Sequence, residues 1–209
     1  MRTILVVGLV LALTQVSQGQ TKNPAEEIMR EAIQKSVHDQ QVVREKYAFD
    51  KENTGENEGN GDGVTIAELF RLNRYNYKVI DLAMIGGQPA YVLSFVPKPR
   101  RDRLKTSGHS NFRIERKNDI LNSLQGTVYL SPDDLGIIRV LTQVKDPPES
   151  IWGVGRLYKM DAIIDQIKID DVWALKELHL TADFSYFLGI KRIKNVVKVK
   201  LKNFRLKAP

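Results

Sequence analysis

The segment Gly126–Val144 reads GTVYLSPDDLGIIRVLTQV and joins two apolar runs through Ser-Pro-Asp-Asp. Proline restricts the backbone and aspartate bonds to nearby backbone groups, so this tetrapeptide predicts a turn between two antiparallel strands. Apolar side chains fall on both faces of these strands: one set is Val128, Leu130, Ile138 and Val140, and the other is Tyr129, Ile137 and Leu141. Because a strand alternates its faces, a sheet with one face in water should not show this pattern. The segment therefore raises the question of what covers the second face.

The chain after this hairpin is predicted to be almost wholly strand. Asp170-Asp171 indicates a turn or a strand end before Trp173. The next segment alternates, and its apolar face consists of Leu178, Leu180, Ala182, Phe184, Tyr186 and Leu188. In the last segment the alternation sets Val197, Val199 and Leu201 against Lys198, Lys200 and Lys202. Gly189 lies in the short connection, so we expect these two strands to pair antiparallel and to turn their apolar side chains to the concave side of the sheet.

The first half of the chain begins with a well-marked helix. Asn23 is typical of a helix cap, Pro24 of the first helical position, and Glu26 of the third position after the cap. The apolar face of this helix is predicted to be Ala25, Ile28, Met29, Ala32, Ile33 and Val37. From Gln41 the period changes, which predicts a strand followed by a polar loop over 50–63.

A second ordered stretch follows this loop. Residues 65–74 are expected to form a strand or a short helix, and a strand is predicted from about Tyr75 that turns back at Gly86-Gly87 as a hairpin. The basic segment 98–111 is predicted to be a loop, and a short helix is expected just before the strand pair described first. Helices early in the chain and strands in succession later indicate an α+β fold with a meandering antiparallel sheet.

The first residues have the features of a secretory signal peptide. In MRTILVVGLVLALTQVSQGQ one arginine precedes a short apolar run that ends in small and polar residues. The run is shorter than the roughly 20 residues of a membrane span, which argues against a retained anchor. We expect residues 1–19 to be removed by cleavage near Gly19 and residues 20–209 to form a single exported domain. The chain contains no cysteine, so the fold must be held by packing alone, and a bacterial periplasm is the expected location.

The chain is basic, with a net charge of +7 that is unevenly spread. The C-terminal segment 191–209 contains no acid and carries Lys191, Arg192, Lys194, Lys198, Lys200, Lys202, Arg205 and Lys207. Such a segment favours acidic partners, and an anionic membrane surface is the expected one. No aromatic platform or groove-reading helix accompanies the lysines, so we expect no nucleic acid partner. The simpler alternative is that these cations only solvate the outer face of the sheet.

No constellation of catalytic or metal-binding residues is apparent in the sequence. The stretch ENEGNGDGVTIAEL invites comparison with a calcium loop, but with Gly63 in the sixth place the twelfth place is Leu69, one residue after Glu68. The three histidines have no metal-ligand spacing, and Asp133-Asp134 is explained by a turn. We therefore predict no enzyme activity, no metal and no cofactor.

Three stretches share features with a known family: GGQPAYVLSFVPKP, NDILNSLQGTVYLSPDDLGIIRV and DDVWALKELHLTADFSYFLGIKRIKNVVKVKLKNF. These features are a helix that leads into a Gly-Thr-Val strand, an Asp-rich turn, a strand with an arginine, and two long closing strands. In them the chain resembles exported bacterial proteins related to the periplasmic lipoprotein-carrier (LolA-like) half-barrel superfamily. The resemblance runs from about Tyr75 to Arg205, and it matches none of that family's lipid-gating residues to a position in this chain.

The resemblance implies a strongly curved antiparallel sheet, a half-barrel, with helices packed on its concave side around an apolar cavity. By this likeness, 20–209 is expected to be a LolA-like domain and a non-enzymatic periplasmic binding or carrier protein for lipid or lipoprotein acyl chains, similar to proteins that sort outer-membrane lipoproteins. The cavity-lining candidates are Val128, Leu130, Ile138, Val140, Leu180, Phe184, Tyr186, Leu188, Val197, Val199 and Leu201.

Two other functions compete with the carrier hypothesis. One is an envelope interaction or sensor protein, in which the barrel is filled and the lysine-rich strand face of Lys198, Lys200 and Lys202 makes the contact. The other is a hydrolase whose site the sequence does not reveal. A contiguous apolar cavity on the order of several hundred Å³ would favour a ligand, whereas a filled interior would favour a structural role.

Overall fold

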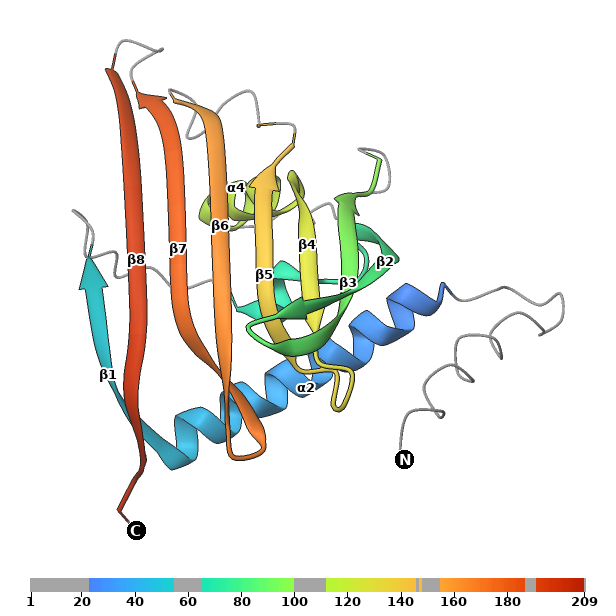
Figure 1. Ribbon diagram of the computed structural model, residues 1–209. Coiled ribbons are helices and arrows are strands. Elements are labelled where there is room, and N and C mark those ends of the chain that lie inside the picture. The colour runs from blue at the N-terminus through green and yellow to red at the C-terminus, as the bar shows by residue number, and fades with distance from the viewer. Residues whose placement is uncertain are drawn as a thin grey trace, which may run out of the picture.

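The protein is built on one antiparallel sheet of eight strands, in the order β1-β8-β7-β6-β5-β4-β3-β2 (Figure 1). The computed structural model describes residues 23–54, 65–99, 112–145, 147, 155–186 and 191–208, and the expected signal peptide lies outside them. The strands are β1 (Tyr47–Thr54), β2 (Tyr75–Ile85), β3 (Gln88–Pro97), β4 (Leu124–Leu130), β5 (Ile137–Val144), β6 (Arg156–Ile169), β7 (Val172–Tyr186) and β8 (Lys191–Leu206). The helices are α2 (Pro24–Lys46), α3 (Ile66–Leu69) and α4 (Phe112–Leu121). The predicted α+β fold is confirmed: the sheet is a curved half-barrel with helices on its concave side.

The long helix α2 crosses the sheet and begins where the sequence predicts (Figure 1). The Asn23 side chain accepts a hydrogen bond from the Ala25 amide at 3.1 Å and donates one to the Tyr77 carbonyl at 2.9 Å, which fixes the helix start to β2. The strand predicted from Gln41 is present as β1 but begins only at Tyr47, because the helix continues to Lys46, and it extends to Thr54, into the segment that was predicted to be a loop. No helix in the part of the chain that the structure describes is long and apolar enough to cross a bilayer.

The buried face of α2 differs from the predicted apolar face at its C-terminal half. The buried residues are Ala25, Met29, Ala32, Ser36, Asp39 and Val43, whereas Val37 is 48% exposed. Their spacing of three and four residues is regular, but the stripe includes two polar side chains. A prediction based on hydrophobicity alone assigns Val37 to the buried face and leaves out Ser36 and Asp39, because these two side chains are polar.

The main core lies between the N-terminal half of α2 and strands β2 to β5. Aromatic rings fill it: Phe95 meets Phe70 edge to face at 5.2 Å between ring centroids and meets Tyr75 at 5.0 Å. Met29 of the helix and Leu93 of β3 are fully buried in the same cluster. Rings in this arrangement fill space efficiently, so this end of the half-barrel is solid.

The hairpin of β4 and β5 confirms the predicted turn and answers the question that its sequence raises. A bulge lies in the pairing after Tyr129, so that Leu130 stands opposite Ile137 and both enter the main core. The prediction that Ile138 shares a face with Val140 is wrong, because the bulge moves Ile138 into a second cluster with Ala90 and Trp173. Ile85 and Tyr129 pack against this cluster. The second face is therefore covered locally by apolar side chains of the protein itself.

The predicted turns at Gly86-Gly87 and Asp170-Asp171 are confirmed, and β7 and β8 pair antiparallel as predicted, while their connection at Gly189 lies outside the described residues. The chain turns from β2 to β3 at Gly86 and Gly87, whose φ angles of 58° and 83° suit glycine. Residues 65–74 contain the short helix α3, whose N-terminus is capped by Thr65 and Glu68 in a reciprocal capping box. The turn between β6 and β7 lies at Asp170, where φ is 51°, a conformation that aspartate tolerates.

The sheet is open, and β1 and β2 form its two edges. On β2 the pairing with β3 shifts between Val79 and Asp81, which leaves Ile80 as an extra residue in the edge strand. Ile80, Leu82 and Met84 are 51%, 55% and 65% exposed. This edge thus combines apolar side chains with an irregular backbone.

Candidate functional site

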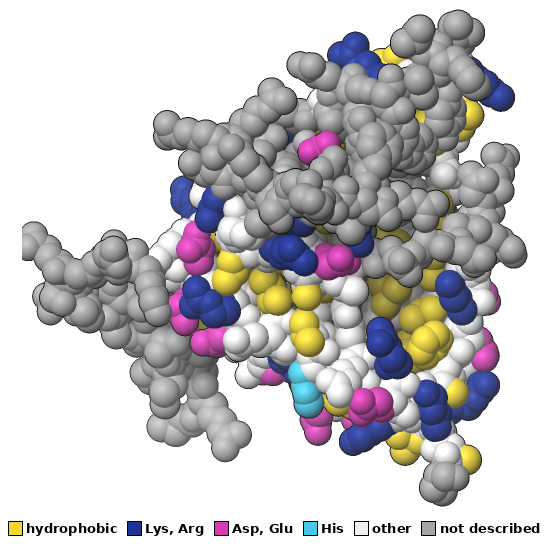
Figure 2. All heavy atoms as spheres, turned by 180° about the vertical axis from the view of Figure 1, so that it is seen from behind, with side chains coloured by type: hydrophobic (Ala, Val, Ile, Leu, Met, Phe, Trp, Pro, Cys, Tyr) yellow, Lys and Arg dark blue, Asp and Glu magenta, His cyan; other side chains and the backbone are white. Residues whose placement is uncertain are grey.

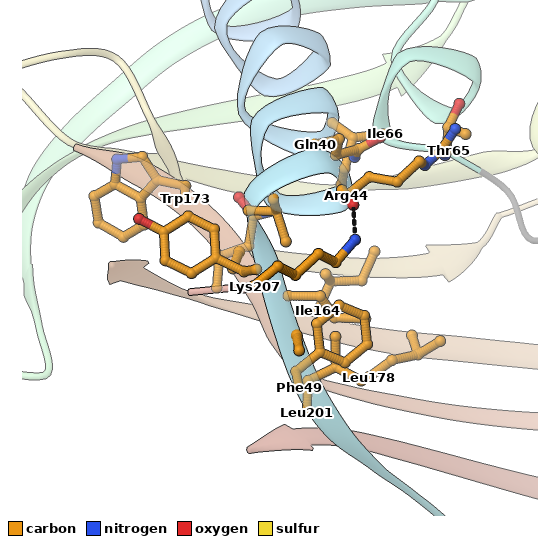
Figure 3. Close-up of a pocket in the computed structure, with 16 residues that line it drawn as sticks. Gln40, Arg44, Phe49, Thr65, Ile66, Ile164, Trp173, Leu178, Leu201 and Lys207 are labelled. Carbon is orange, nitrogen blue, oxygen red and sulfur yellow. Dashed lines mark hydrogen bonds between the residues drawn. The ribbon is translucent and has the colours of Figure 1, made fainter. Parts of the chain in front are cut away.

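The C-terminal half of α2 does not close onto the sheet as the N-terminal half does. A cavity of about 730 Å³ lies between this half of the helix, β1 and the concave face of β6 to β8 (Figure 3). We refer to it as the α2–sheet cavity. Its lining consists of Gln40, Val43, Arg44, Tyr47, Ala48, Phe49, Thr65, Ile66, Ile164, Gln166, Trp173, Ala174, Leu175, Leu178, Leu201 and Lys207. The lining is mainly apolar, and the cavity volume lies in the range of roughly 300–1,000 Å³ that small-molecule sites occupy.

The cavity exists because small side chains line the parts of the sheet and β1 that face the helix here. Ala174 of β7 and Ala48 of β1 lie where the aromatic rings of the main core have no counterpart. The helix contributes only Val43 as a buried apolar side chain at this end, in a small cluster with Tyr47 and Val172. The side chains that α2, Ala48 and Ala174 supply here therefore do not fill the space between helix and sheet.

Tyr47 closes one end of the cavity. Its hydroxyl donates a hydrogen bond to Asp170 at 2.5 Å, in the turn between β6 and β7. This bond is the main reason that the pKa of Tyr47 is raised, because loss of the proton would set two negative charges side by side. The hydrogen bond thereby fixes the position of the Tyr47 ring beside the apolar lining.

Trp173 also belongs to the lining, its side chain packs in the second cluster with Ala90 and Ile138, and polar contacts hold both its backbone and its ring. The buried carboxylate of Asp39 on α2 accepts a hydrogen bond from the Trp173 amide at 3.1 Å, and Lys35 lies 3.1 Å from the same carboxylate. The indole Nε1 donates to Asp134 at 3.1 Å, and Lys168 lies 5.9 Å from the ring centroid. Asp39, a buried residue of α2 that the sequence pattern did not indicate, thus positions Trp173 of the cavity lining.

Gln166 is a polar residue inside the cavity. It is 9% exposed, and its Oε1 atom has no hydrogen-bond partner among the residues that the structure describes. Gln166 is two residues after Ile164 on β6, and the alternation of the strand places both side chains on the face that lines the α2–sheet cavity. A buried acceptor without a donor is costly, so Gln166 is the polar exception in a mainly apolar lining.

The mouth of the cavity is marked by exposed cations. Arg44 lies in the last turn of α2, and Lys207 follows β8; the Lys207 ammonium donates a hydrogen bond to the Arg44 carbonyl at 2.6 Å (Figure 3). A lysine at this position satisfies a carbonyl at the helix C-terminus, where the helix dipole favours positive charge. On the face turned away from the viewer of Figure 1, hydrophobic side chains lie among lysine and arginine side chains (Figure 2).

The structure separates the cavity-lining candidates of the sequence into groups. Val128, Leu130 and Val140 are fully buried in the main core, and Ile138 lies in the second cluster, so none of these four lines the α2–sheet cavity. By strand register, Leu180, Phe184, Val197, Val199 and Leu201 share the concave face with Leu178, and they are half-buried. Of these, Leu201 lines the cavity. The side chain of Tyr186 and all of Leu188 lie outside the described residues.

The lysine-rich strand face lies on the convex side and is less basic than the sequence suggests. Lys200 lies 3.5 Å from Glu177 of β7, and Lys202 lies 2.8 Å from Glu52 of β1. The register sets Lys198 opposite His179. Acids from the two flanking strands therefore compensate part of the charge, a feature that strand pairing creates and the local sequence does not contain.

Most lining residues were not among the sequence candidates. Arg44, Tyr47 and Phe49 follow the point where a strand was expected, and the helix end at Lys46 brings them beside the sheet. Leu178 was predicted on the apolar face of its strand, and this alternation was the signal that could have added it. Among the described residues, no group of three or more His, Cys, Asp or Glu side chains could hold a metal ion, and most of the calcium-like stretch lies outside them.

Comparisons with known proteins give one weak likeness. No family model matches the chain, and no curated protein matches it in sequence. Among solved structures, the chain is similar to a DUF1329 family protein from Desulfovibrio piger ATCC 29098, with 14% sequence identity and a TM-score of 0.32. The likeness covers 68% of this chain and 47% of that one, so the chain spans about half the length of that protein. A likeness this weak indicates neither a shared function nor a shared ligand.

Proposed function

We propose that this protein is a non-enzymatic binding or carrier protein that holds an acyl chain of a lipid or lipoprotein in the α2–sheet cavity. The observation that carries the proposal is an apolar cavity of about 730 Å³ on the concave face of a half-barrel. Burial of hydrocarbon in such a space is favourable by about 25 cal/mol per Å² of apolar surface removed from water. The resemblance to LolA-like carriers supports the same function.

The proposed place of action is the bacterial periplasm, reached through the signal peptide over 1–19. There a carrier would take an acyl chain from one membrane surface and release it at another. The competing function, an interaction or sensor protein that acts through Lys198, Lys200 and Lys202, has less support. Two of these lysines are paired with acids, and the interior of the half-barrel is not filled at this end.

Binding of a fluorescent fatty acid tests the proposal. An anthroyloxy-labelled stearate should bind the mature protein in the micromolar range, with a rise in fluorescence as the probe leaves water. Ala48→Phe places a ring in the cavity from β1 and should weaken binding at least tenfold, about 1.4 kcal/mol, because the ring occupies the space of the chain.

Thr54→Phe is the matched control for this experiment. Thr54 is exposed on the same strand and pairs with Lys198 of the convex face, so a ring there should leave probe binding unchanged. Thermal unfolding of both variants shows whether the fold is kept. Absence of probe binding in the parent protein, or equal binding by both variants, would contradict the proposed function. Mass spectrometry of lipids extracted from the purified protein identifies the natural occupant.

A further inference from the structure

The charges at the cavity mouth have one sign. Arg44 and Lys207 belong to its lining, and no acidic residue is found among the described residues that line it. The hydrogen bond from the Lys207 ammonium to the Arg44 carbonyl brings the C-terminal end of β8 against the end of α2, so both residues border the cavity at the C-terminal end of the helix. Two cations that border one cavity favour an anionic group at that end of it.

The acids that follow or contact residues of the lining have other partners. Asp170 accepts the hydroxyl of Tyr47, and Glu45 accepts the side-chain amide of Gln41 at 2.9 Å. Glu68, which follows Thr65 of the lining, accepts two hydrogen bonds from Lys117, at 2.9 and 3.1 Å.

Arg44 and Lys207, by contrast, form no ion pair with a carboxylate of the described residues. Within the part of the chain that the structure describes, no carboxylate lies within 4.0 Å of the charged groups of Arg44 and Lys207. Both side chains are exposed, whereas Ala174 and Trp173 at the inner end are buried. The cavity is therefore polar and positive at its mouth and apolar inside.

We propose that the occupant of the α2–sheet cavity is a single-chain anionic amphiphile, whose acid group lies between Arg44 and Lys207 and whose hydrocarbon chain runs inward along Leu178 and Leu201. This inference rests on the proposed function and adds the class of ligand to it. Arginine binds a carboxylate or a phosphate through two parallel hydrogen bonds, and lysine adds a point charge. A neutral or cationic head group would leave this pair of positive charges uncompensated.

Ligands that share one chain and differ in the head group provide the test. Dodecanoate, dodecyl phosphate, dodecanol and dodecyltrimethylammonium are compared by displacement of 1-aminoanthracene, a small neutral fluorescent probe, from the mature protein. Both anions should bind at least tenfold more tightly than dodecanol, and the cation more weakly than dodecanol. The order of the two anions then shows whether the natural head group is a carboxylate or a phosphate. High salt should weaken only the anions.

The variant Arg44→Gln/Lys207→Gln should bring the ratio of dodecanoate to dodecanol affinity close to one. Lys198→Gln, which removes a cation of the convex face, is the control and should keep the ratio of the parent protein. Lys207→Arg should keep it as well, because the positive charge remains.

Equal binding of dodecanoate and dodecanol by the parent protein would overturn this inference and leave the carrier function standing. Loss of the preference in Lys198→Gln would also overturn it. Failure of the neutral probe and of all four ligands to bind would instead overturn the proposed function itself.

Discussion

Asp134 connects the turn between β4 and β5 with β6 and β7. One carboxylate oxygen accepts a hydrogen bond from Lys168 at 2.9 Å, and the other accepts the amide of Gly136 at 3.1 Å. The indole of Trp173 donates to the same carboxylate. Burial alone would raise the pKa of Asp134, but the hydrogen bonds from Lys168, Gly136 and Trp173 outweigh it and hold the pKa well below the usual range.

The lowered pKa of Asp134 predicts an acid-sensitive contribution to stability. The unfolded chain, with a carboxyl pKa of about 3.9, binds a proton at a higher pH than the folded protein does, so the contribution is complete above about pH 5 and falls as the pH decreases below that. Asp134→Asn should lower the free energy of unfolding at pH 7 by about 1–3 kcal/mol, and the difference from the parent protein should shrink as the pH falls through 4 toward 2. Urea unfolding at a series of pH values measures it.

The neighbouring Asp133 supplies the control, because it is exposed in the same turn. Asp133→Asn should change the unfolding free energy at pH 7 by less than about 0.5 kcal/mol. If Asp134→Asn and the parent protein keep the same difference from pH 7 to pH 3, the carboxylate does not act as described.

Individual residues show where reasoning from the sequence reaches its limit. Alternation placed Val140 and Leu130 in the core correctly, because a regular strand preserves parity. The same alternation gave the wrong face for Ile138, because the bulge adds one residue to β5 and the side chains on its two sides no longer alternate regularly. Gln166 keeps the parity of Ile164, but nothing in its local sequence distinguishes an amide inside a cavity from one in water. Register shifts depend on the partner strand, which the local pattern does not contain.

At the scale of elements, the start of α2 depends on one side chain. Asn23 caps the helix and also bonds to β2, so it joins a local signal to a tertiary contact. Asn23→Ala should lower the free energy of unfolding by about 1–2 kcal/mol, because it leaves an amide of the first turn and the Tyr77 carbonyl without these partners. Chemical denaturation measures the loss.

Asn23→Ser separates the two roles of this residue. Serine can still cap the helix but is too short to reach Tyr77 from the same position, so its effect should be about half that of alanine. An effect of serine equal to that of alanine would show that the bond to β2 accounts for the whole loss.

Elements were predictable where a chemical signal marks their ends. The cap at Asn23, the two glycines at Gly86 and the proline turn before β5 each restrict the backbone locally, and all three positions are confirmed. The end of α2 has no such signal. No glycine or proline follows Lys46, and the helix passes directly into β1, where the first residue, Tyr47, bonds to Asp170, far along the chain.

At the scale of the whole molecule, the half-barrel is solid beneath one half of α2 and hollow beneath the other. Phe95→Ala, at the solid end, should lower the free energy of unfolding by about 3–5 kcal/mol through lost burial and a new cavity. Leu178→Ala, at the hollow end, should cost only about 1 kcal/mol, because its side chain is half-buried and already faces empty space. Urea midpoints of the two variants give the comparison.

The same two variants separate stability from binding. Leu178→Ala should weaken binding of the fluorescent stearate by several-fold, since the chain loses an apolar contact, whereas Phe95→Ala should leave it unchanged below its unfolding midpoint. A stability loss in Leu178→Ala as large as in Phe95→Ala would mean that the cavity closes in solution. The open space could not be predicted from the sequence, because it depends on the tertiary arrangement that brings Ala48 and Ala174 to the same cavity.

The irregular edge strand β2 has a consequence for self-association. A regular edge offers its free amide and carbonyl groups to a strand of another molecule, and the apolar side chains of Leu82 and Met84 would favour such a pair. The extra residue at Ile80 interrupts the spacing of those groups, and Lys78 and Asp81 place charges on both sides of it. The bulge therefore opposes polymerisation through this edge. Deletion of Ile80 would restore an even spacing of the amide and carbonyl groups, so that strands of other molecules could pair with β2.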